Sequence, residues 1–145
     1  MKDLPDPSWK HLATLSNADV YELRDDVIVI VPNRDAVDDE NSARESLAFQ
    51  RAHWSSRKKA GAVIVSMEPM REQTAAARGI YANEAQSALT TCFALVGESF
   101  YAQAVSAVFT GLAKPTIPTN IFRSIEEADA WIREINGSDG GAPGA

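Results

Sequence analysis

The stretch that decides the fold runs from Thr119 to Ile135 and reads TNIFRSIEEADAWIREI. Its first part, Thr119 to Arg123, is short and β-rich, which favours a strand. Ser124 and Glu127 have the S-x-x-E spacing of a helix capping box. Apolar residues then recur on one helical stripe, at Ile125, Ala128, Trp131 with Ile132, and Ile135. The sequence therefore predicts that a strand and a capped amphipathic helix close the domain.

The rest of the chain alternates between strand-like and helix-like segments. Runs of β-formers or of continuous apolar residues predict strands at Val20 to Leu23, Val27 to Val31, Ala62 to Met67 and Leu89 to Gly97. Helical spacing of apolar residues predicts helices at Asp39 to Lys59, Glu72 to Asn83 and Ser99 to Leu112. The whole order is β-β-α-β-α-β-α-β-α. It favours an α/β fold in which helices pack on a mixed β-sheet of about five strands.

Length and composition indicate one domain with flanking segments. A chain of 145 residues is a common size for one domain, and 45% hydrophobic with 23% charged residues is typical of a packed globular protein. Residues 1–15 contain two prolines and no periodicity, so we expect an N-terminal lead-in. Residues 16–136 form the predicted domain. The Gly-rich tail, 137–145, has nothing to bury and is expected to be disordered.

Charge and cysteine content disfavour several kinds of partner. The net charge of −6 argues against nucleic acid, because phosphate contacts require clustered Lys and Arg. The one basic run, Arg57 to Lys59, ends a predicted helix, where cations complement the dipole. Cys92 is the only cysteine, which excludes an intrachain disulfide or a thiolate metal cluster. With no signal-peptide pattern and no run of ~18 apolar residues, we expect a cytosolic (cytoplasmic) protein without membrane insertion.

Two adjacent segments resemble a known family. Residues 109–122 read FTGLAKPTIPTNIF, and residues 124–132 read SIEEADAWI. Together they are similar to the carboxy-terminal signature of bacterial SpoIIAA-like proteins of the STAS-like fold, a family that includes anti-sigma-factor antagonists and the cytoplasmic tails of anion transporters. The resemblance covers the chain from Asp19 to Ile132. It implies a STAS-like domain and, with it, a regulatory role through protein–protein interaction.

The same resemblance implies where a regulatory switch would lie. In signalling members of the family, an Asp-Ser-Ser-Gly motif at a helix start carries the phosphorylated serine. The matching place here, residues 66–77, reads SMEPMREQTAAA, so alanines occupy the phosphoacceptor positions. Alanine cannot accept a phosphate, which argues against the family's switch. Ser66 and Thr74 are the nearby hydroxyls and the candidate regulatory residues, although strand packing and helix capping are the preferred interpretations.

The titratable residues form no pattern that predicts catalysis. His11 and His53 are far apart in sequence and have no His or Cys at metal-ligand spacing. Ligands of open α/β sheets bind near strand ends, and a polar group flanks one predicted strand end: Glu68, Arg71, Glu72, Arg78 and Glu84. No nucleophile stands beside a base there, so ion pairs along a helix are the preferred interpretation. The sequence predicts no catalytic residue, no cofactor and no metal.

Two hypotheses for function remain open. The first is a non-catalytic STAS-like regulatory module that binds a protein partner or forms a homodimer. The alternative is a domain that binds a small, lipid-like apolar ligand in a pocket under helix 99–112 and loop 114–119, since that helix has more apolar residues than one narrow stripe requires. The residues proposed for this surface or pocket are Phe100, Tyr101, Val105, Val108, Phe109, Lys114 and Ile117. An enzyme that uses Glu68 or Glu72 as a base is a third, less favoured hypothesis.

Overall fold

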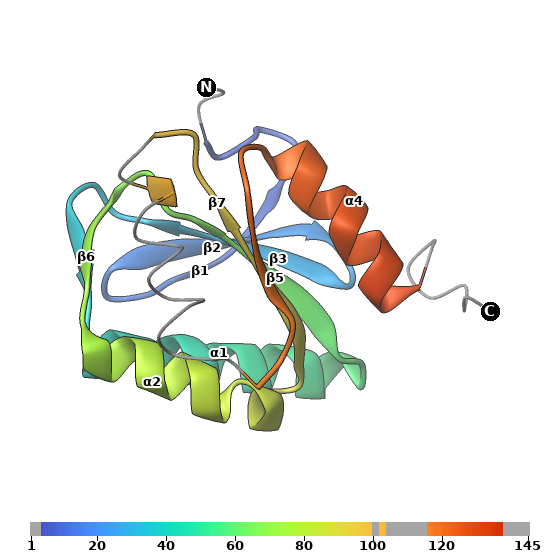
Figure 1. Ribbon diagram of the computed structural model, residues 1–145. Coiled ribbons are helices and arrows are strands. Elements are labelled where there is room, and N and C mark those ends of the chain that lie inside the picture. Colours follow the sequence, from blue (N-terminus) through green and yellow to red (C-terminus); the bar gives the residue numbers. More distant parts are fainter. Residues whose placement is uncertain (1–3, 100–101, 104–115, 138–145) are drawn as a thin grey trace.

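The computed structural model describes residues 4–99, 102–103 and 116–137 (Figure 1). The strands are β1 (Lys10–Thr14), β2 (Ala18–Arg24), β3 (Val27–Pro32), β4 (Ala36–Asp38), β5 (Gly61–Ser66), β6 (Met70–Gln73), β7 (Thr90–Val96) and β8 (Thr119–Phe122). The helices are α1 (Glu40–Arg57), α2 (Ala75–Glu84), the short 3₁₀ helix η1 (Gln86–Ala88) and α4 (Ile125–Asn136). Most of the predicted helix 99–112 and the tail from residue 138 lie outside the described residues.

Six strands form the main sheet, in the order β1-β2-β3-β5-β7-β8. The pairs β1–β2 and β2–β3 are antiparallel, whereas β3, β5, β7 and β8 run parallel to one another. In the parallel part of the sheet, Val29 pairs with Ile64, Ile64 pairs with Ala94, and Ala94 pairs with Asn120. The predicted α/β class with a mixed sheet is confirmed. A second, two-stranded parallel sheet joins β4 to β6.

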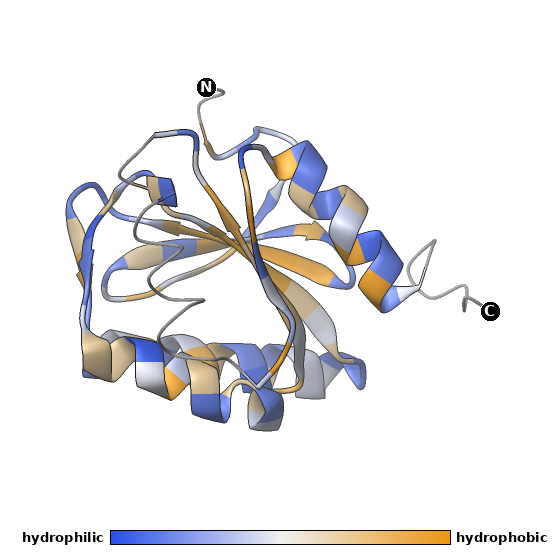
Figure 2. Cartoon of the chain, viewed as in Figure 1, coloured by the Kyte–Doolittle hydropathy of each residue, from blue (hydrophilic) through white to orange (hydrophobic). Residues whose placement is uncertain are grey.

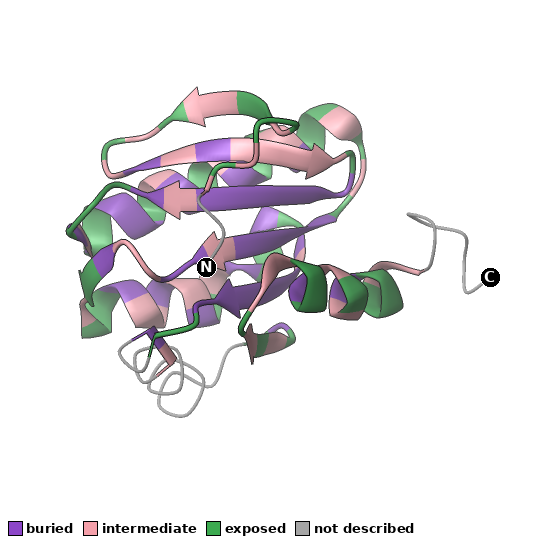
Figure 3. Cartoon of the chain, turned by 90° about the horizontal axis from the view of Figure 1, so that it is seen from above, coloured by how far each residue is buried: buried purple, intermediate pink, exposed green. Residues whose placement is uncertain are grey.

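Helices cover both faces of the main sheet, with α1 and α2 on one side and α4 on the other (Figure 1). Strand β3 shows why this requires a continuous apolar run. Its residues Ile28 and Ile30 belong to the core cluster on the α1 side, and Val27 and Val29 to the cluster on the α4 side. Apolar residues therefore concentrate in the central strands, which are also the most buried (Figures 2 and 3).

Helix α1 is fixed at both ends by its own sequence. Asp39 accepts a hydrogen bond from the backbone N–H of Ser42, and the Ser42 hydroxyl accepts one from the backbone N–H of Asp39, which completes a capping box. The helix ends at Lys58, whose backbone is left-handed with φ 54°. Of the basic run, Arg57 pairs with Glu22 at 2.9 Å and Lys59 pairs with Asp25 at 3.2 Å. The basic run thus attaches the end of α1 to the β2–β3 hairpin.

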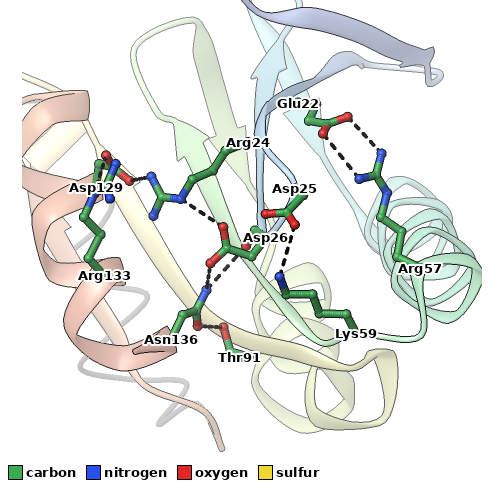
Figure 4. Close-up of polar contacts among 10 residues, drawn as sticks. All are labelled: Glu22, Arg24, Asp25, Asp26, Arg57, Lys59, Thr91, Asp129, Arg133 and Asn136. Atoms are coloured by element: carbon green, nitrogen blue, oxygen red, sulfur yellow. Dashed lines mark hydrogen bonds and ion pairs between the residues drawn. The ribbon is translucent and has the colours of Figure 1, made fainter. Parts of the chain in front are cut away.

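Helix α4 is attached to the sheet by a polar network (Figure 4). Arg24 donates to Asp26 at 2.9 Å and also pairs with Asp129 of α4. The last residue of α4, Asn136, donates to the Asp26 carboxylate at 3.0 Å and accepts from the Thr91 hydroxyl at 2.8 Å. The Asp26 side chain is only 2% exposed. A buried carboxylate of this kind requires its partners, so the network fixes where α4 lies.

Three details differ from the sequence-based expectation. The expected lead-in includes strand β1, which sequence periodicity missed because an edge strand is mostly exposed. Residues 72 and 73, predicted as helix, belong to β6, and α2 begins only at Ala75. Ile135, expected on the buried stripe of α4, is 39% exposed, whereas the next residue, Asn136, contacts Asp26 and Thr91.

The cap of α4 supplies a simple stability test. The Ser124 hydroxyl accepts from the backbone N–H of Glu127 at 3.1 Å, and the Glu127 carboxylate accepts from the N–H of Arg123 at 3.1 Å. Ser124→Ala removes the acceptor, so we expect the free energy of unfolding to fall by about 1 kcal/mol. Urea unfolding measures it. Ser124→Gly should lose only a few tenths of a kcal/mol, and an unchanged Ser124→Ala variant would contradict the capping role.

Candidate functional site

The parallel strands β3, β5, β7 and β8 all end at the same edge of the sheet (Figure 1). Two loops lie there, residues 67–69 after β5 and residues 97–99 after β7, and we call them the edge loops. Glu68 joins them, because its Oε2 accepts from the backbone N–H of Glu98 and from that of Ser99, both at 2.9 Å. Gly97 is packed so closely that an added Cβ would lie 2.5 Å from the Cβ of Ala102. The edge loops therefore form one connected surface.

These contacts change the acidity of Glu68. Partial burial raises its pKa, but hydrogen bonds from the Ser99 hydroxyl and from the N–H groups of Ser99 and Glu98 outweigh burial, and the pKa is lowered below its ordinary value of 4.5. A carboxylate with a lowered pKa stabilises the fold fully above the unfolded pKa, and this contribution is lost as the pH falls through the folded pKa.

We therefore expect Glu68→Gln to be less stable than the wild type at about pH 7, with the difference shrinking below about pH 4. The reason is that only the ionised carboxylate accepts both backbone N–H groups as a charged acceptor. Urea midpoints measured across this pH range check the prediction. Glu72→Gln, on an exposed position of β6, is the control and should show no such trend. A difference between Glu68→Gln and wild type that stays constant with pH would refute it.

Strand β6 connects the first edge loop to the start of α2, which lies at the other end of that strand (Figure 1). Thr74 is the N-cap, and its hydroxyl accepts from the backbone N–H of Ala77 at 3.1 Å. Ser66 is 1% exposed at the end of β5. These two candidate regulatory hydroxyls are therefore found in a helix cap and in the core, and phosphorylation of either stays a prediction. Around them, four side chains are exposed: Arg71, Glu72, Ala75 and Ala76.

The polar residues that the sequence places together at this strand end make separate contacts in the structure. Glu68 serves the edge loops, Arg78 donates to the Gln73 carbonyl at 2.7 Å, and Glu84 pairs with Arg44 of α1 at 3.2 Å. No two of these carboxylates are joined in a shared site by the contacts of the described residues. Of the residues proposed for the apolar surface, Ile117 is buried in the core cluster on the α1 side. The others, Phe100, Tyr101, Val105, Val108, Phe109 and Lys114, lie outside the described residues.

A second site, which the sequence did not indicate, is a partly open cavity that reaches into the core between the sheet and the pair α1 and α2. Its volume is about 40 Å³. Most of its lining is apolar, but one end is polar and includes Asp38, Ser46, Gln50, Gln73 and Tyr81. Ser42, Ser46 and Gln50 are spaced by four on one buried face of α1, and Asp38 ends β4 just before the helix. That spacing is the sequence signal that could have revealed the site.

Hydrogen bonds connect this polar end into a network. Asp38 is 5% exposed. Its Oδ1 accepts from the Ser42 hydroxyl at 2.6 Å and from the Tyr81 hydroxyl at 3.2 Å, and its Oδ2 accepts from Gln73 Nε2 at 3.2 Å. Burial, together with the adjacent Asp38 charge, raises the pKa of Tyr81 well above its ordinary value, so this phenol stays protonated and donates.

The remaining titratable candidates have structural environments. His11 bonds to Asp19 at 3.0 Å on the exposed side of β1 and β2, and His53 stacks on Phe49 with ring centroids 5.7 Å apart. Burial raises the pKa of the Cys92 thiol to about 11, and Cys92 packs in the core on the α4 side. Within the described residues, no group of three or more His, Cys, Asp or Glu side chains is arranged to hold a metal ion. No helix in that part of the chain is long and apolar enough to cross a membrane.

The architecture defines the class of the protein, which has a SpoIIAA-like fold. It is similar to the anti-sigma factor antagonist SpoIIAA in its unphosphorylated form, with 13% identity, a TM-score of 0.52, and coverage of 81% of this chain and 99% of that one. It is also similar to an uncharacterised protein with a SpoIIAA-like fold, from the DUF3478 family of Shewanella loihica PV-4. In that case the identity is 7%, the TM-score is 0.54, and the coverage is 90% and 99%.

The family follows from the sequence match over residues 21–136. The chain belongs to the family described as Domain of unknown function (DUF7793). No curated protein sequence matches the chain. The resemblance to SpoIIAA-like proteins is thus confirmed at the level of the fold.

Proposed function

We propose that the chain is a non-catalytic regulatory module that binds a protein partner through the surface at the start of α2. This partner surface consists of Arg71, Glu72, Ala75 and Ala76 together with the edge loops. The observation that carries the proposal is that Glu68 joins the two edge loops at one end of β6, while the exposed residues of β6 and of the helix start continue from them along the chain. Such a connection holds the surface in place before a partner arrives, which reduces the entropy lost on binding.

The fold supports this assignment. A neighbour with the same fold is an anti-sigma factor antagonist, and its match covers 81% of this chain. The amino acids at the helix start also favour contact over modification. Ala75 and Ala76 are exposed at the first turn of α2, so a partner backbone meets small side chains there, flanked by one basic and one acidic residue. A partner that reads this surface recognises its shape and its Arg71 and Glu72 charges.

The test is capture of a partner by the full chain from its own host, compared with two variants. Arg71→Glu with Glu72→Arg reverses the two exposed charges that β6 contributes to the partner surface without touching the core. Glu126→Arg with Arg133→Glu reverses an exposed acidic and an exposed basic position on α4, which covers the opposite face, and is the matched control. We expect a stoichiometric partner that the wild type and the α4 control retain and the partner-surface variant loses.

Chromatography with light scattering separates a heterologous partner from self-association. If the wild type is a homodimer and the partner-surface variant is a monomer, the partner is a second copy of the chain that binds the same surface. A strict monomer that captures no protein, or a partner lost equally in both variants, contradicts the proposal.

A further inference from the structure

We propose that the core cavity is a binding site for a small molecule with a hydrogen-bond-donating head, a primary ammonium by preference, and a short apolar body. Met67 belongs both to an edge loop and to the cavity wall, and Gln73 lies between residues of the partner surface, but the inference rests on contacts inside the core and does not depend on the proposed function. It rests on three observations: the apolar walls, the buried carboxylate, and an acceptor atom without a donor.

The walls of the cavity are apolar on the sheet side. They are formed by side chains from β2, β3, β5 and β7 and from the segments that follow β1 and β5: Leu15, Ala18, Ile30, Val65, Met67 and Leu95. Methionine adjusts its shape to an occupant more easily than branched residues do. Walls of this kind accept an alkyl group and give no hydrogen bond to a fully polar ligand.

The buried carboxylate of Asp38 lies at the polar end. Each carboxylate oxygen has room for two hydrogen bonds, and within the part of the chain that the structure describes Oδ2 accepts one, from Gln73. The three donors to Asp38, namely Ser42, Tyr81 and Gln73, are all neutral side chains. Among the ion pairs of the described residues, none includes Asp38. A cationic head in the cavity supplies the missing counter-charge.

The second acceptor is Gln73 Oε1, which is buried without a hydrogen-bond partner. The orientation of this amide is fixed by chemistry, because Asp38 is an acceptor and Nε2 must face it. A buried acceptor left unsatisfied is costly, and such groups are rare in folded proteins. Gln73 also lines the cavity. A primary ammonium has three hydrogens and donates to Gln73 Oε1 and to Asp38 Oδ2 at the same time. A hydroxyl has one hydrogen and donates to only one of these two acceptors.

The volume limits the apolar body. One water-sized group occupies about 10–15 Å³ by this measure, so the cavity of about 40 Å³ has room for about three such groups. A head with two or three carbons fits within this volume. The probes for the test are therefore propan-1-amine, propan-1-ol and propanoate, which share a carbon chain and differ in the head.

The test is nuclear magnetic resonance of the full chain titrated with each probe near neutral pH. We expect saturable shifts of the Met67 and Leu95 methyl groups and of the Gln73 side-chain amide. Affinity should be highest for propan-1-amine, lower for propan-1-ol and undetectable for propanoate, which brings a second anion beside Asp38. Gln73→Leu should weaken propan-1-amine binding by about tenfold, the effect of losing one hydrogen bond to a charged group.

A filled cavity provides the second arm. Ala18→Leu places a larger side chain in the cavity wall and should abolish saturable binding, while Ala52→Leu, at an exposed position of α1, is the matched control and should bind as the wild type does. Circular dichroism confirms that each variant folds, and Gln73→Leu keeps the test decisive if Ala18→Leu does not. Shifts that do not saturate, equal binding of all three probes, or full binding by Gln73→Leu would overturn the proposal and leave a cavity that holds only water.

Discussion

Replacing Trp54 with Ala is expected to lower the free energy of unfolding by about 3–5 kcal/mol, the range for removing a large buried aromatic side chain. Trp54 is 0% exposed on the inner face of α1, and its ring lies against Gly61 at the start of β5. The contact is so close that a Cβ on Gly61 would lie 2.3 Å from the indole. The indole therefore fixes the distance between α1 and the central strand.

Urea unfolding measures this effect, and two further variants test its cause. Gly61→Ala should also destabilise, by about 1–3 kcal/mol, because the added methyl overlaps the ring. Trp9→Ala removes a partly buried Trp at the surface and should lose clearly less than Trp54→Ala does. If Trp54→Ala and Trp9→Ala lower the free energy of unfolding by the same amount, the indole of Trp54 does not fix the distance between α1 and β5.

Replacing Arg24 with Ala is expected to destabilise the protein by about 3–5 kcal/mol, because it leaves a buried carboxylate without its charge partner. Figure 4 shows Arg24 between Asp26 and Asp129, where it joins the β2–β3 hairpin to α4. Asp26 retains only Asn136 in that variant, and an amide does not replace a guanidinium. Thermal or urea unfolding checks the prediction.

Arg133→Ala is the matched control, since Arg133 pairs with the same Asp129 but is 47% exposed. We expect Arg133→Ala to lower the free energy of unfolding by less than about 1 kcal/mol, as is usual for an exposed pair. The double variant Arg24→Met with Asp26→Leu removes both charges and should recover much of the stability lost in Arg24→Ala. A loss in Arg24→Ala as small as that in Arg133→Ala would show that Asp26 does not need its partner.

The sequence was sufficient for the fold because buried segments carry strong patterns. The parallel strands β5 and β7 are continuous apolar runs, and the S-x-x-E motif marked the start of α4. The edge strand β1 escapes prediction because its side chains are mostly exposed and show no clear alternation. The sequence predicts helix at Glu72 and Gln73 because both are good helix formers, but they belong to β6, and pairing with β4 overrides that local preference.

The core cavity was missed for a different physical reason. The four-residue spacing of Ser42 and Ser46 is a weak signal, because single serines are common on exposed helix faces, whereas in the folded chain both are buried and Ser42 donates to Asp38. Gln73 comes 35 residues after Asp38, so nothing local connects the two. The edge loops are similar, because Glu68 meets the 97–99 loop only after β5 and β7 have paired. Contacts between distant segments define both sites.

The most direct test of the account is to map the captured partner on the full chain by amide chemical-shift changes. We expect the largest changes at residues 67–69, 71–76 and 97–99, and we expect Arg71→Glu with Glu72→Arg to abolish them. Changes confined to α4 and β1, on other parts of the molecule, would contradict the claim that the start of α2 is the partner surface.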